Sequence, residues 1–163
     1  MAGKKPKSAQ RIVVALLLTE VALPRISDAA VEQQRVEAAF CSSRPRHILI
    51  IEDNRDFREG LRLLLESWGH RVEEAVTGEQ GLEMVRLVHP EVVLVDLGLP
   101  GIDGYAVAGG VRSSPGGDAI LLVAITGFGR AKDRRQAEDA GFDTHLTKPV
   151  SPRELAEVLL LRG

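Results

Sequence analysis

Five side chains that can bind a metal ion or contact a phosphoryl group stand at the ends of short apolar runs: Glu52, Asp53, Asp96, Thr126 and Lys148. If the three carboxylates meet, they repel one another, and ionising all of them becomes unfavourable. A hard divalent cation such as Mg²⁺ removes that conflict, because it accepts carboxylate oxygens and keeps several waters. The lysine adds a positive charge and the threonine a hydroxyl donor. Together these groups suit phosphoryl transfer to an aspartate nucleophile.

The apolar pattern also predicts the elements that position these residues. The run 92–95 has no polar alternation, which is typical of a strand buried on both faces of a parallel sheet. Leu-Pro-Gly at 99–101 breaks this strand, so Asp96 lies at its carboxyl end. Strands are predicted at residues 47–51, 71–76, 92–96, 120–126 and 144–147, and helices at 56–68, 77–88, 105–112, 131–140 and 151–161.

The alternation of strands and helices predicts an α/β fold with a five-stranded parallel sheet and right-handed crossovers. The carboxyl ends of parallel strands lie on one edge, where open α/β sheets bind ligands. An isolated Val-Asp pair would favour a plain helix-capping role for Asp96. Polar residues at four strand ends favour a shared site instead.

The composition is that of an ordinary globular protein. The chain has 163 residues, of which 27% are charged and 44% apolar, enough for one domain with a core and an appendage. A net charge of −2 gives no reason to expect nucleic-acid binding. The single Cys41 excludes an internal disulfide framework. No apolar run reaches the ~20 residues that a membrane span requires.

Residues 1–45 differ from the rest and are predicted to be an accessory segment and linker. Lysines precede the apolar stretch 12–18, as in an export signal, but Glu20 interrupts the pattern and no clear cleavage site follows. Ser-Ser-Arg-Pro at 42–45 is typical of a linker. The functional domain is therefore placed at residues 46–163.

Four motifs within that domain occur in a familiar order. They are Ile-Ile-Glu-Asp-Asn at 50–54, Val-Asp-Leu-Gly-Leu-Pro-Gly-Ile-Asp-Gly at 95–104, Ala-Ile-Thr-Gly at 124–127 and Thr-Lys-Pro at 147–149. With them, the stretch 46–163 resembles the receiver domain of two-component response regulators. The resemblance implies a doubly wound, flavodoxin-like fold with strand order 2-1-3-4-5, and a role in phosphorelay signal transduction.

The resemblance also implies a Mg²⁺-dependent phosphoacceptor site. Asp96 matches the residue that accepts a phosphoryl group from a histidine kinase or a histidine phosphotransfer protein. Asp53 and Asp96 match the direct Mg²⁺ ligands, Glu52 a ligand through water, and the Gly98 carbonyl the backbone ligand. Such a domain is not a free-standing enzyme, since it catalyses only its own phosphorylation and dephosphorylation.

Further matches concern the conformational switch. Thr126 matches the hydroxyl that moves toward the phosphoryl group, Lys148 the lysine that contacts it, and Pro149 the residue after a cis peptide bond. The position three before Lys148 is often Tyr or Phe in this family and is His145 here. His145 occurs there in receivers attached to hybrid kinases and replaces the usual aromatic switch residue.

The expected partners also follow from the resemblance. Leu63 falls off the apolar stripe of its predicted helix, and that helix docks kinases and phosphotransfer domains in this family, so Leu63 is a candidate docking residue. A homodimer through the last two helices and an unidentified downstream protein are further expectations. Because no output domain follows the last helix, we expect a cytoplasmic stand-alone receiver or the receiver end of a hybrid kinase.

Two alternatives come from other classes of protein. Phosphatases of the haloacid-dehalogenase type also use a strand-end Asp with Mg²⁺, but they need a second Asp two positions on, where Gly98 stands. The other alternative is a non-phosphorylated structural or interaction module with the same fold. The intact set of five site residues argues against it.

Some residues beside these motifs carry smaller predictions. Gly98 and Phe128 flank the approach of water in receivers and cannot orient it, which predicts slow loss of the phosphoryl group. Phe57 is expected in the core. His47 and His70 have no metal-ligand spacing and are expected at the surface or at strand edges.

Overall fold

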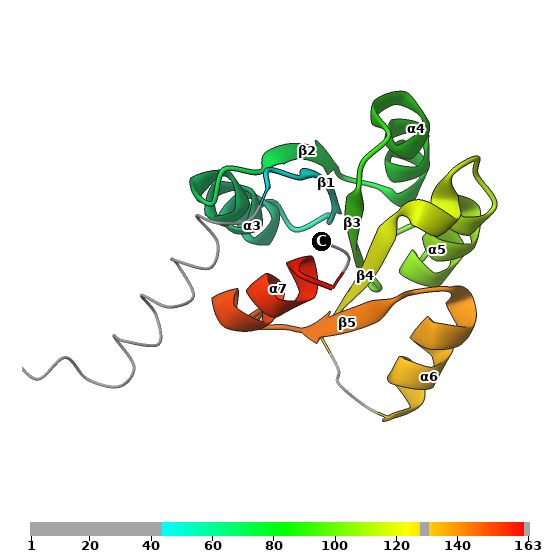
Figure 1. Cartoon of the computed structure of the whole chain (residues 1–163). Helices are drawn as coiled ribbons and strands as arrows, with labels where there is room; N and C mark the ends of the chain where they lie inside the picture. The colour runs from blue at the N-terminus through cyan, green and yellow to red at the C-terminus, as the bar shows by residue number, and fades with distance from the viewer. Residues whose placement is uncertain (1–43, 128–130, 162–163) are drawn as a thin grey trace, which may run out of the picture. The chain divides into compact units, whose positions relative to one another are not determined.

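A computed structural model describes residues 44–127 and 131–161 of the chain (Figure 1). Its elements are β1 (His47–Ile51), α3 (Arg55–Ser67), β2 (Arg71–Ala75), α4 (Gly78–Val88), β3 (Val92–Asp96), α5 (Gly104–Arg112), the 3₁₀ turn η1 (Gly117–Ala119), β4 (Leu121–Thr126), α6 (Ala131–Ala140), β5 (Thr144–Thr147) and α7 (Pro152–Leu159). Residues 1–43 of the predicted accessory segment and Phe128 lie outside the described residues.

The five strands form one parallel sheet in the order β2-β1-β3-β4-β5. The predicted α/β class and strand order are confirmed. β3 is buried along its whole length, as its unbroken apolar run indicated. In the described residues, the last helix ends at Leu159, two residues before the predicted end, because the amide of Leu160 turns back to the Glu157 carbonyl.

Local side-chain caps start three of the helices where the sequence placed turns. Asn54 accepts a hydrogen bond from the amide of Phe57, and Thr77 accepts one from the amide of Gln80. An N-cap side chain satisfies an amide that has no partner inside the helix. Asp103 caps α5 in the same way. The caps begin α3 and α5 directly after the loops that carry the acidic residues.

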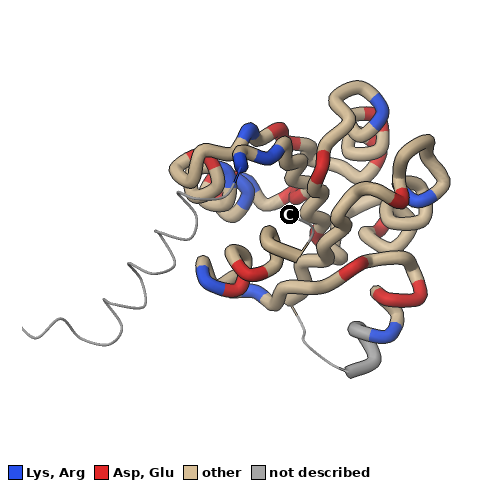
Figure 2. The backbone as a smooth tube through the Cα atoms, in the orientation of Figure 1, with Lys and Arg blue, Asp and Glu red and all other residues tan. Residues whose placement is uncertain are grey.

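Helices cover both faces of the sheet (Figure 1). Alternate residues of β1 point to opposite faces: Ile48 and Ile50 pack with α3 and α7, whereas Leu49 and Ile51 pack with α4, α5 and α6. Basic and acidic positions are interspersed along the described helices and loops (Figure 2). No helix in the described ranges is long and apolar enough to cross a membrane.

The parallel arrangement gives the sheet two distinct edges. At the carboxyl edge lie the residues that follow the strands, including Glu52, Asp96 and Lys148. At the amino edge lie the residues that precede them, including Arg46 and Glu91. These two edges carry the charged groups that the following sections describe.

Candidate functional site

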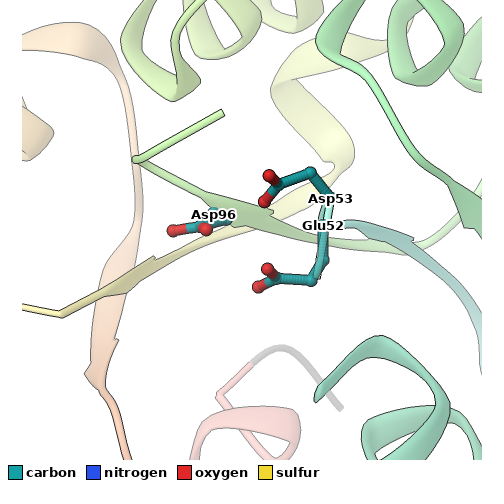
Figure 3. Close-up of side chains that lie close together, drawn as sticks. All are labelled: Glu52, Asp53 and Asp96. Atoms are coloured by element: carbon teal, nitrogen blue, oxygen red, sulfur yellow. The ribbon is translucent and has the colours of Figure 1, made fainter. Parts of the chain in front are cut away.

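Three carboxylates meet at the carboxyl edge. Glu52 and Asp53 follow β1, and Asp96 ends β3, the neighbouring strand in the sheet. One carboxylate oxygen from each lies within 4.8 Å of the other two (Figure 3). Glu52 is fully buried and Asp96 is 8% exposed, whereas Asp53 is open to solvent. The sequence correctly placed these residues together, because adjacent parallel strands end side by side.

Lys148 joins the cluster from the loop after β5. Its Nζ donates to Glu52 Oε2 at 2.7 Å and to Asp96 Oδ2 at 3.0 Å. The same Nζ lies 4.5 Å from the centre of the Phe57 ring. Phe57 was expected in the core, but it is only half-buried, and its ring face contacts the ammonium. A cation–π contact of this kind is worth about 0.5–2 kcal/mol and helps hold Lys148 over the carboxylates.

Burial and hydrogen bonding have opposite effects on the pKa values of Glu52 and Lys148. Burial raises the pKa of Glu52, and the hydrogen bond from Lys148 offsets part of this effect. Burial alone would lower the pKa of Lys148, but its hydrogen bonds to Glu52 and Asp96 prevail and raise it. Lys148 therefore stays protonated at neutral pH and supplies a fixed positive charge between two carboxylates.

Backbone amides hold the carboxylates in orientation. The amide of Gly98 donates to Asp96 Oδ1 at 3.1 Å, and the amide of Asn54 donates to Glu52 Oε1 at 3.1 Å. A Cβ added to Gly98 would lie 3.7 Å from the Asp96 carboxylate oxygens, which is an ordinary contact distance. Gly98 thus lies against the predicted nucleophile and leaves open space beside it.

Thr126 completes this edge at the end of β4. A cleft of about 410 Å³ is lined by Asp96, Leu97, Gly98, Tyr105, Thr126, Gly127 and Lys148. The carbonyl of Thr126 accepts the amide hydrogen of Lys148 at 2.8 Å, which ties β4 to the lysine loop. The Lys148–Pro149 peptide bond is cis, the conformation that the resemblance implied. Tyr105, which the sequence analysis did not single out, forms one wall.

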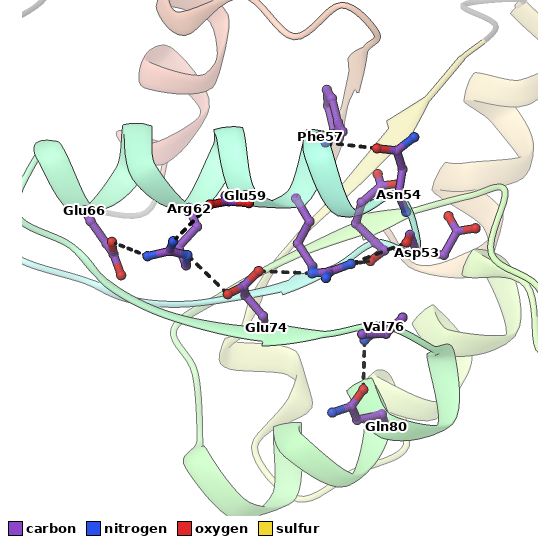
Figure 4. Close-up of polar contacts among 11 residues, drawn as sticks. Asp53, Asn54, Phe57, Glu59, Arg62, Glu66, Glu74, Val76 and Gln80 are labelled. Atoms are coloured by element: carbon purple, nitrogen blue, oxygen red, sulfur yellow. Dashed lines mark hydrogen bonds and ion pairs between the residues drawn. The ribbon is translucent and has the colours of Figure 1, made fainter.

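Arg58 is a further residue that the sequence analysis missed. From α3, its Nη1 donates to the Glu52 carbonyl at 2.7 Å and to the Asp53 carbonyl at 3.4 Å. Its Nε donates to Glu74 of β2 at 3.0 Å, and Arg62 also contacts Glu74 (Figure 4). The sequence feature that could have indicated this role is the spacing: Arg58 lies one helical turn after Asn54, so its side chain can reach back to the backbone before the helix. Arg58 fixes the backbone of the acidic pair from outside the cleft.

Comparison with known proteins identifies the family. A profile of the response regulator receiver domain matches residues 48–160. The chain belongs to this family. The matched stretch contains every strand residue except His47 and every residue of the carboxylate cluster, so the family assignment and the geometry concern the same domain.

Individual relatives agree with the receiver assignment. The transcriptional regulatory protein AfsQ1 of Streptomyces coelicolor is 35% identical over 108 residues, which are 66% of this chain and 47% of AfsQ1. The chain thus spans about half the length of that relative. A putative response regulator from Chloroflexus aurantiacus has a TM-score of 0.68 at 31% identity, over 71% of this chain and 95% of its own.

One similar receiver of known structure holds a metal ion. The receiver domain of the sensor histidine kinase PA1611 from Pseudomonas aeruginosa, with a magnesium ion coordinated in its active site cleft, is 28% identical with a TM-score of 0.66. The match covers 71% of this chain and 95% of that one. In the present receiver, three clustered carboxylates supply the hard oxygen donors that Mg²⁺ prefers.

Two predicted residues lie away from the cleft of the receiver. His145 is half-buried on β5, opposite Ala124 of β4, and lines a groove with α7. Leu63 is 54% exposed on α3, in keeping with its place off the apolar stripe.

His70, which was expected at the surface or at a strand edge, is instead 6% exposed, and its Nδ1 accepts a hydrogen bond from the Arg46 amide.

Proposed function

We propose that this receiver accepts a phosphoryl group on Asp96 in a Mg²⁺-dependent reaction and changes conformation for a partner protein. The observation that carries the proposal is the position of Lys148 Nζ, 3.0 Å from Asp96 and 2.7 Å from Glu52 beside the carboxylate cluster. Asp96 is paired with this ammonium and lines a cleft of about 410 Å³, through which a phosphodonor would reach it.

The transfer itself is a displacement at phosphorus. A carboxylate oxygen of Asp96 forms a bond to phosphorus while the bond from phosphorus to the nitrogen of a phosphohistidine breaks, and the imidazole keeps the electron pair. Glu52, Asp53, Asp96 and the Gly98 carbonyl would hold Mg²⁺, which neutralises negative charge on the phosphoryl oxygens when bound. The Lys148 ammonium then exchanges a carboxylate oxygen for a phosphoryl oxygen as its hydrogen-bond acceptor and stays within the cleft.

The response to phosphorylation follows from the backbone around the cleft. A phosphoryl group on Asp96 brings new acceptor oxygens next to the Thr126 hydroxyl and the Lys148 ammonium. The Lys148 amide donates a hydrogen bond to the Thr126 carbonyl, and this bond connects the end of β4 to the loop that follows β5. Movement of Thr126 is therefore transmitted to β5, where His145 faces α7. His145 takes the place of an aromatic switch residue in this proposal.

The proposed partners occupy the surface of α3 and the last two helices. A histidine kinase or histidine phosphotransfer protein would dock on α3, where Leu63 is exposed. A homodimer or an unidentified downstream protein would use α6 and α7. We place the protein in the cytoplasm, without nucleic acid as a direct ligand. It would catalyse only its own phosphorylation and dephosphorylation.

The decisive experiment is phosphorylation by acetyl phosphate, followed by intact mass or Phos-tag mobility. Wild type with Mg²⁺ should gain one phosphoryl group, and Asp96→Asn should gain none, because its amide is not a nucleophile. Asp103→Asn is the matched control, since Asn also caps a helix and Asp103 lies outside the cluster. Labelling that persists in Asp96→Asn, or that is equal in EDTA, would contradict the proposal.

The same experiment separates the alternative of a structural module. Such a module would remain unlabelled in wild type with acetyl phosphate and with a phosphorylated histidine kinase. A free-standing phosphatase of the haloacid-dehalogenase type would release phosphate from added phosphate esters over many turnovers. Stoichiometric labelling of Asp96 without such turnover supports the receiver function alone.

A further inference from the structure

A second cavity lies at the amino edge of the sheet, at the end of the strands opposite Asp96. It has a volume of about 500 Å³, opens to solvent, and is lined by the end of α4, the α4–β3 loop, the α5–β4 loop and the residues before β1. Small-molecule sites typically measure about 300–1,000 Å³. The cavity shares no lining residue with the cleft at Asp96.

A buried arginine that has no direct bond to a carboxylate among the described residues lines this cavity. Arg46 is 5% exposed. Within residues 44–127 and 131–161, its guanidinium makes no hydrogen bond or ion pair, although its backbone amide donates to His70. Burial lowers the pKa of Arg46, but an arginine still remains protonated in proteins. A buried charge is costly unless it is paired. Glu91 attracts this guanidinium electrostatically, but its direct bond is to Arg44, so an anion bound in the cavity would give Arg46 a direct partner.

The guanidinium is also within reach of a ligand. In the described part of the chain, the fully enclosed side-chain nitrogens without a hydrogen-bond partner are His47 Nε2 and His70 Nε2, and the Arg46 nitrogens are not among them. Since Arg46 is a cavity-lining residue that is otherwise buried, the cavity is the route by which its nitrogens meet solvent.

Other charges on the lining have the same sign. Arg86 in the last turn of α4 and His89 at its C-cap line the cavity next to Arg44. Glu91 is the one carboxylate among the lining residues of this cavity, and it is paired with Arg44. Positive charge on the lining therefore exceeds negative charge, even with neutral histidine.

The remaining walls are apolar and fixed in place. Val85, Pro90, Pro115 and Ile120 contribute apolar surface. The Glu91 amide donates to the His47 carbonyl at 2.8 Å, and the Glu91 carbonyl accepts the Leu121 amide at 2.9 Å. These hydrogen bonds tie the α4–β3 loop to β1 and β4. A ligand would find the cavity already formed, which lowers the entropy lost on binding.

We propose that this cavity binds a small amphipathic anion, with a carboxylate or phosphate head group at Arg46 and Arg86 and an apolar body against Val85 and Ile120. The charge excess accounts for the head group, and the apolar walls account for the body. The proposal is independent of phosphorylation at Asp96, because the two sites lie at opposite edges of the sheet.

The test is an NMR titration of the full chain, labelled with ¹⁵N, with octyl phosphate and with octanoate below their micelle concentrations. At least one should bind saturably and shift the amides of Arg46, Val85 and Ile120. Octanol, which lacks the charge, and inorganic phosphate, which lacks the apolar body, should each bind at least about tenfold more weakly. The octyl phosphate and octanoate titrations together identify the preferred head group.

Matched variants assign the binding to the buried arginine. Arg46→Gln should weaken the better ligand at least about tenfold, as expected when a charge-assisted hydrogen bond is lost. Arg71→Gln removes an exposed arginine from the same edge that does not line the cavity, and should bind as wild type. If Arg46→Gln does not fold, the exposed Arg86→Gln provides the measurement, with a weakening of about threefold or more.

Three results would overturn the proposal. The first is that neither amphiphile shifts the lining amides at millimolar concentration. The second is that Arg46→Gln binds the better amphiphile as tightly as Arg71→Gln does. If Arg46→Gln does not fold, the same comparison is made with Arg86→Gln. The third is that inorganic phosphate binds as well as octyl phosphate, which would show an anion site that does not use the apolar walls.

Discussion

The carboxyl and amino edges of the sheet present opposite charge arrangements. At the carboxyl edge, Glu52, Asp53 and Asp96 surround one ammonium. At the amino edge, the cavity lining has three arginines and one carboxylate. The buried Glu52 has a direct partner at 2.7 Å, whereas the buried Arg46 has none in the described residues.

The difference shows how one topology creates two kinds of site. Parallel strands bring all their carboxyl ends to one edge and all their amino ends to the other, so loop residues far apart in sequence converge at both. A cluster whose buried charge is already paired can exchange that partner for a phosphoryl group. A cluster whose buried charge is unpaired gains most from an added ligand.

The largest expected effect is on the lifetime of the phosphorylated protein. It concerns the carboxyl edge alone, because only this edge forms a covalent bond in our proposal. Gly98 leaves open space 3.7 Å from the Asp96 carboxylate, and it cannot orient an attacking water. A positioned proton-handling group contributes about 10²–10⁴-fold. The amide of an asparagine can orient a water but does not take up its proton, so its contribution is smaller. Gly98→Asn should therefore shorten the phosphoprotein lifetime by about tenfold or more.

The lifetime is measured by removing the phosphodonor and following decay by mass with Mg²⁺ present. Gly109→Asn is the matched control, because Gly109 also has open space around its Cβ position but lies on the surface of α5. Decay of the wild type within seconds, or equal rates in all three proteins, would contradict the expectation.

The second prediction breaks the charge balance at the carboxyl edge. Lys148→Ala leaves the buried Glu52 without its cation, and breaking a fully buried pair costs roughly 3–5 kcal/mol. Because the Lys148 side chain keeps 26% exposure, we expect a loss of about 2 kcal/mol in the free energy of unfolding, measured in urea. Adding Glu52→Gln should restore most of it.

Two comparisons make that result specific. Arg153→Ala removes an exposed ion pair to Glu157 and should change the free energy of unfolding by about 0.5 kcal/mol or less. Arg46→Gln at the amino edge removes a buried charge that has no direct bond to a carboxylate in the described ranges, and should leave stability unchanged or increase it. Equal losses in Lys148→Ala and Arg46→Gln would remove the distinction between the two edges.

The sequence predicted the carboxyl edge well because its signals are local. Each strand is a short apolar run, and the residue after the run must lie at the strand end. Asp96 and Lys148, 52 positions apart, could therefore be placed together from the pattern of the chain. The motifs added the strand order, which apolar periodicity alone does not determine.

The amino edge could not be predicted in this way. Nothing in the residues around Arg46 indicates that its guanidinium is buried, because that burial depends on the packing of α4 and the α5–β4 loop around it. His70 follows a glycine at the end of α3, and its pattern is that of a turn residue. Arg58 likewise lies on a polar helix face, and its contact with the Glu52 carbonyl becomes visible only in three dimensions.

The third prediction asks whether the carboxyl edge is positioned from outside the cleft. Arg58 donates to the carbonyls of Glu52 and Asp53, the backbone that presents the proposed metal ligands. Residues that orient metal ligands typically contribute about 10–100-fold in affinity. Arg58→Gln should therefore raise the Mg²⁺ dissociation constant of the unphosphorylated protein about tenfold, measured by calorimetry.

Arg62 provides a matched control for this measurement. It also contacts Glu74, but the structure records no bond from it to the backbone of the acidic pair among the described residues. Arg62→Gln should therefore bind Mg²⁺ within about twofold of wild type. An equal loss in the two variants would assign the effect to the Glu74 contact rather than to backbone positioning.

The smallest predicted effect concerns pH at the amino edge. His70 is buried, and its Nδ1 accepts the Arg46 amide, so a proton on Nδ1 would break this bond. Burial, with help from the charge of Arg46 and against that of Glu91, lowers the pKa of His70. The unfolded chain then binds more protons below an unfolded pKa of about 6.5. Stability is therefore full above that pH and decreases as pH falls through it.

Between pH 7.5 and pH 5.5 this histidine should remove about 1 kcal/mol from the free energy of unfolding, measured in urea at each pH. His70→Asn keeps an acceptor for the Arg46 amide but cannot titrate, so its stability should change less over the same interval. His89→Asn is the control, because His89 is exposed with φ of 48° at the end of α4, a conformation that Asn tolerates. The control should lose stability in parallel with wild type. If His70→Asn also does so, the hydrogen bond at His70 has no part in the pH response.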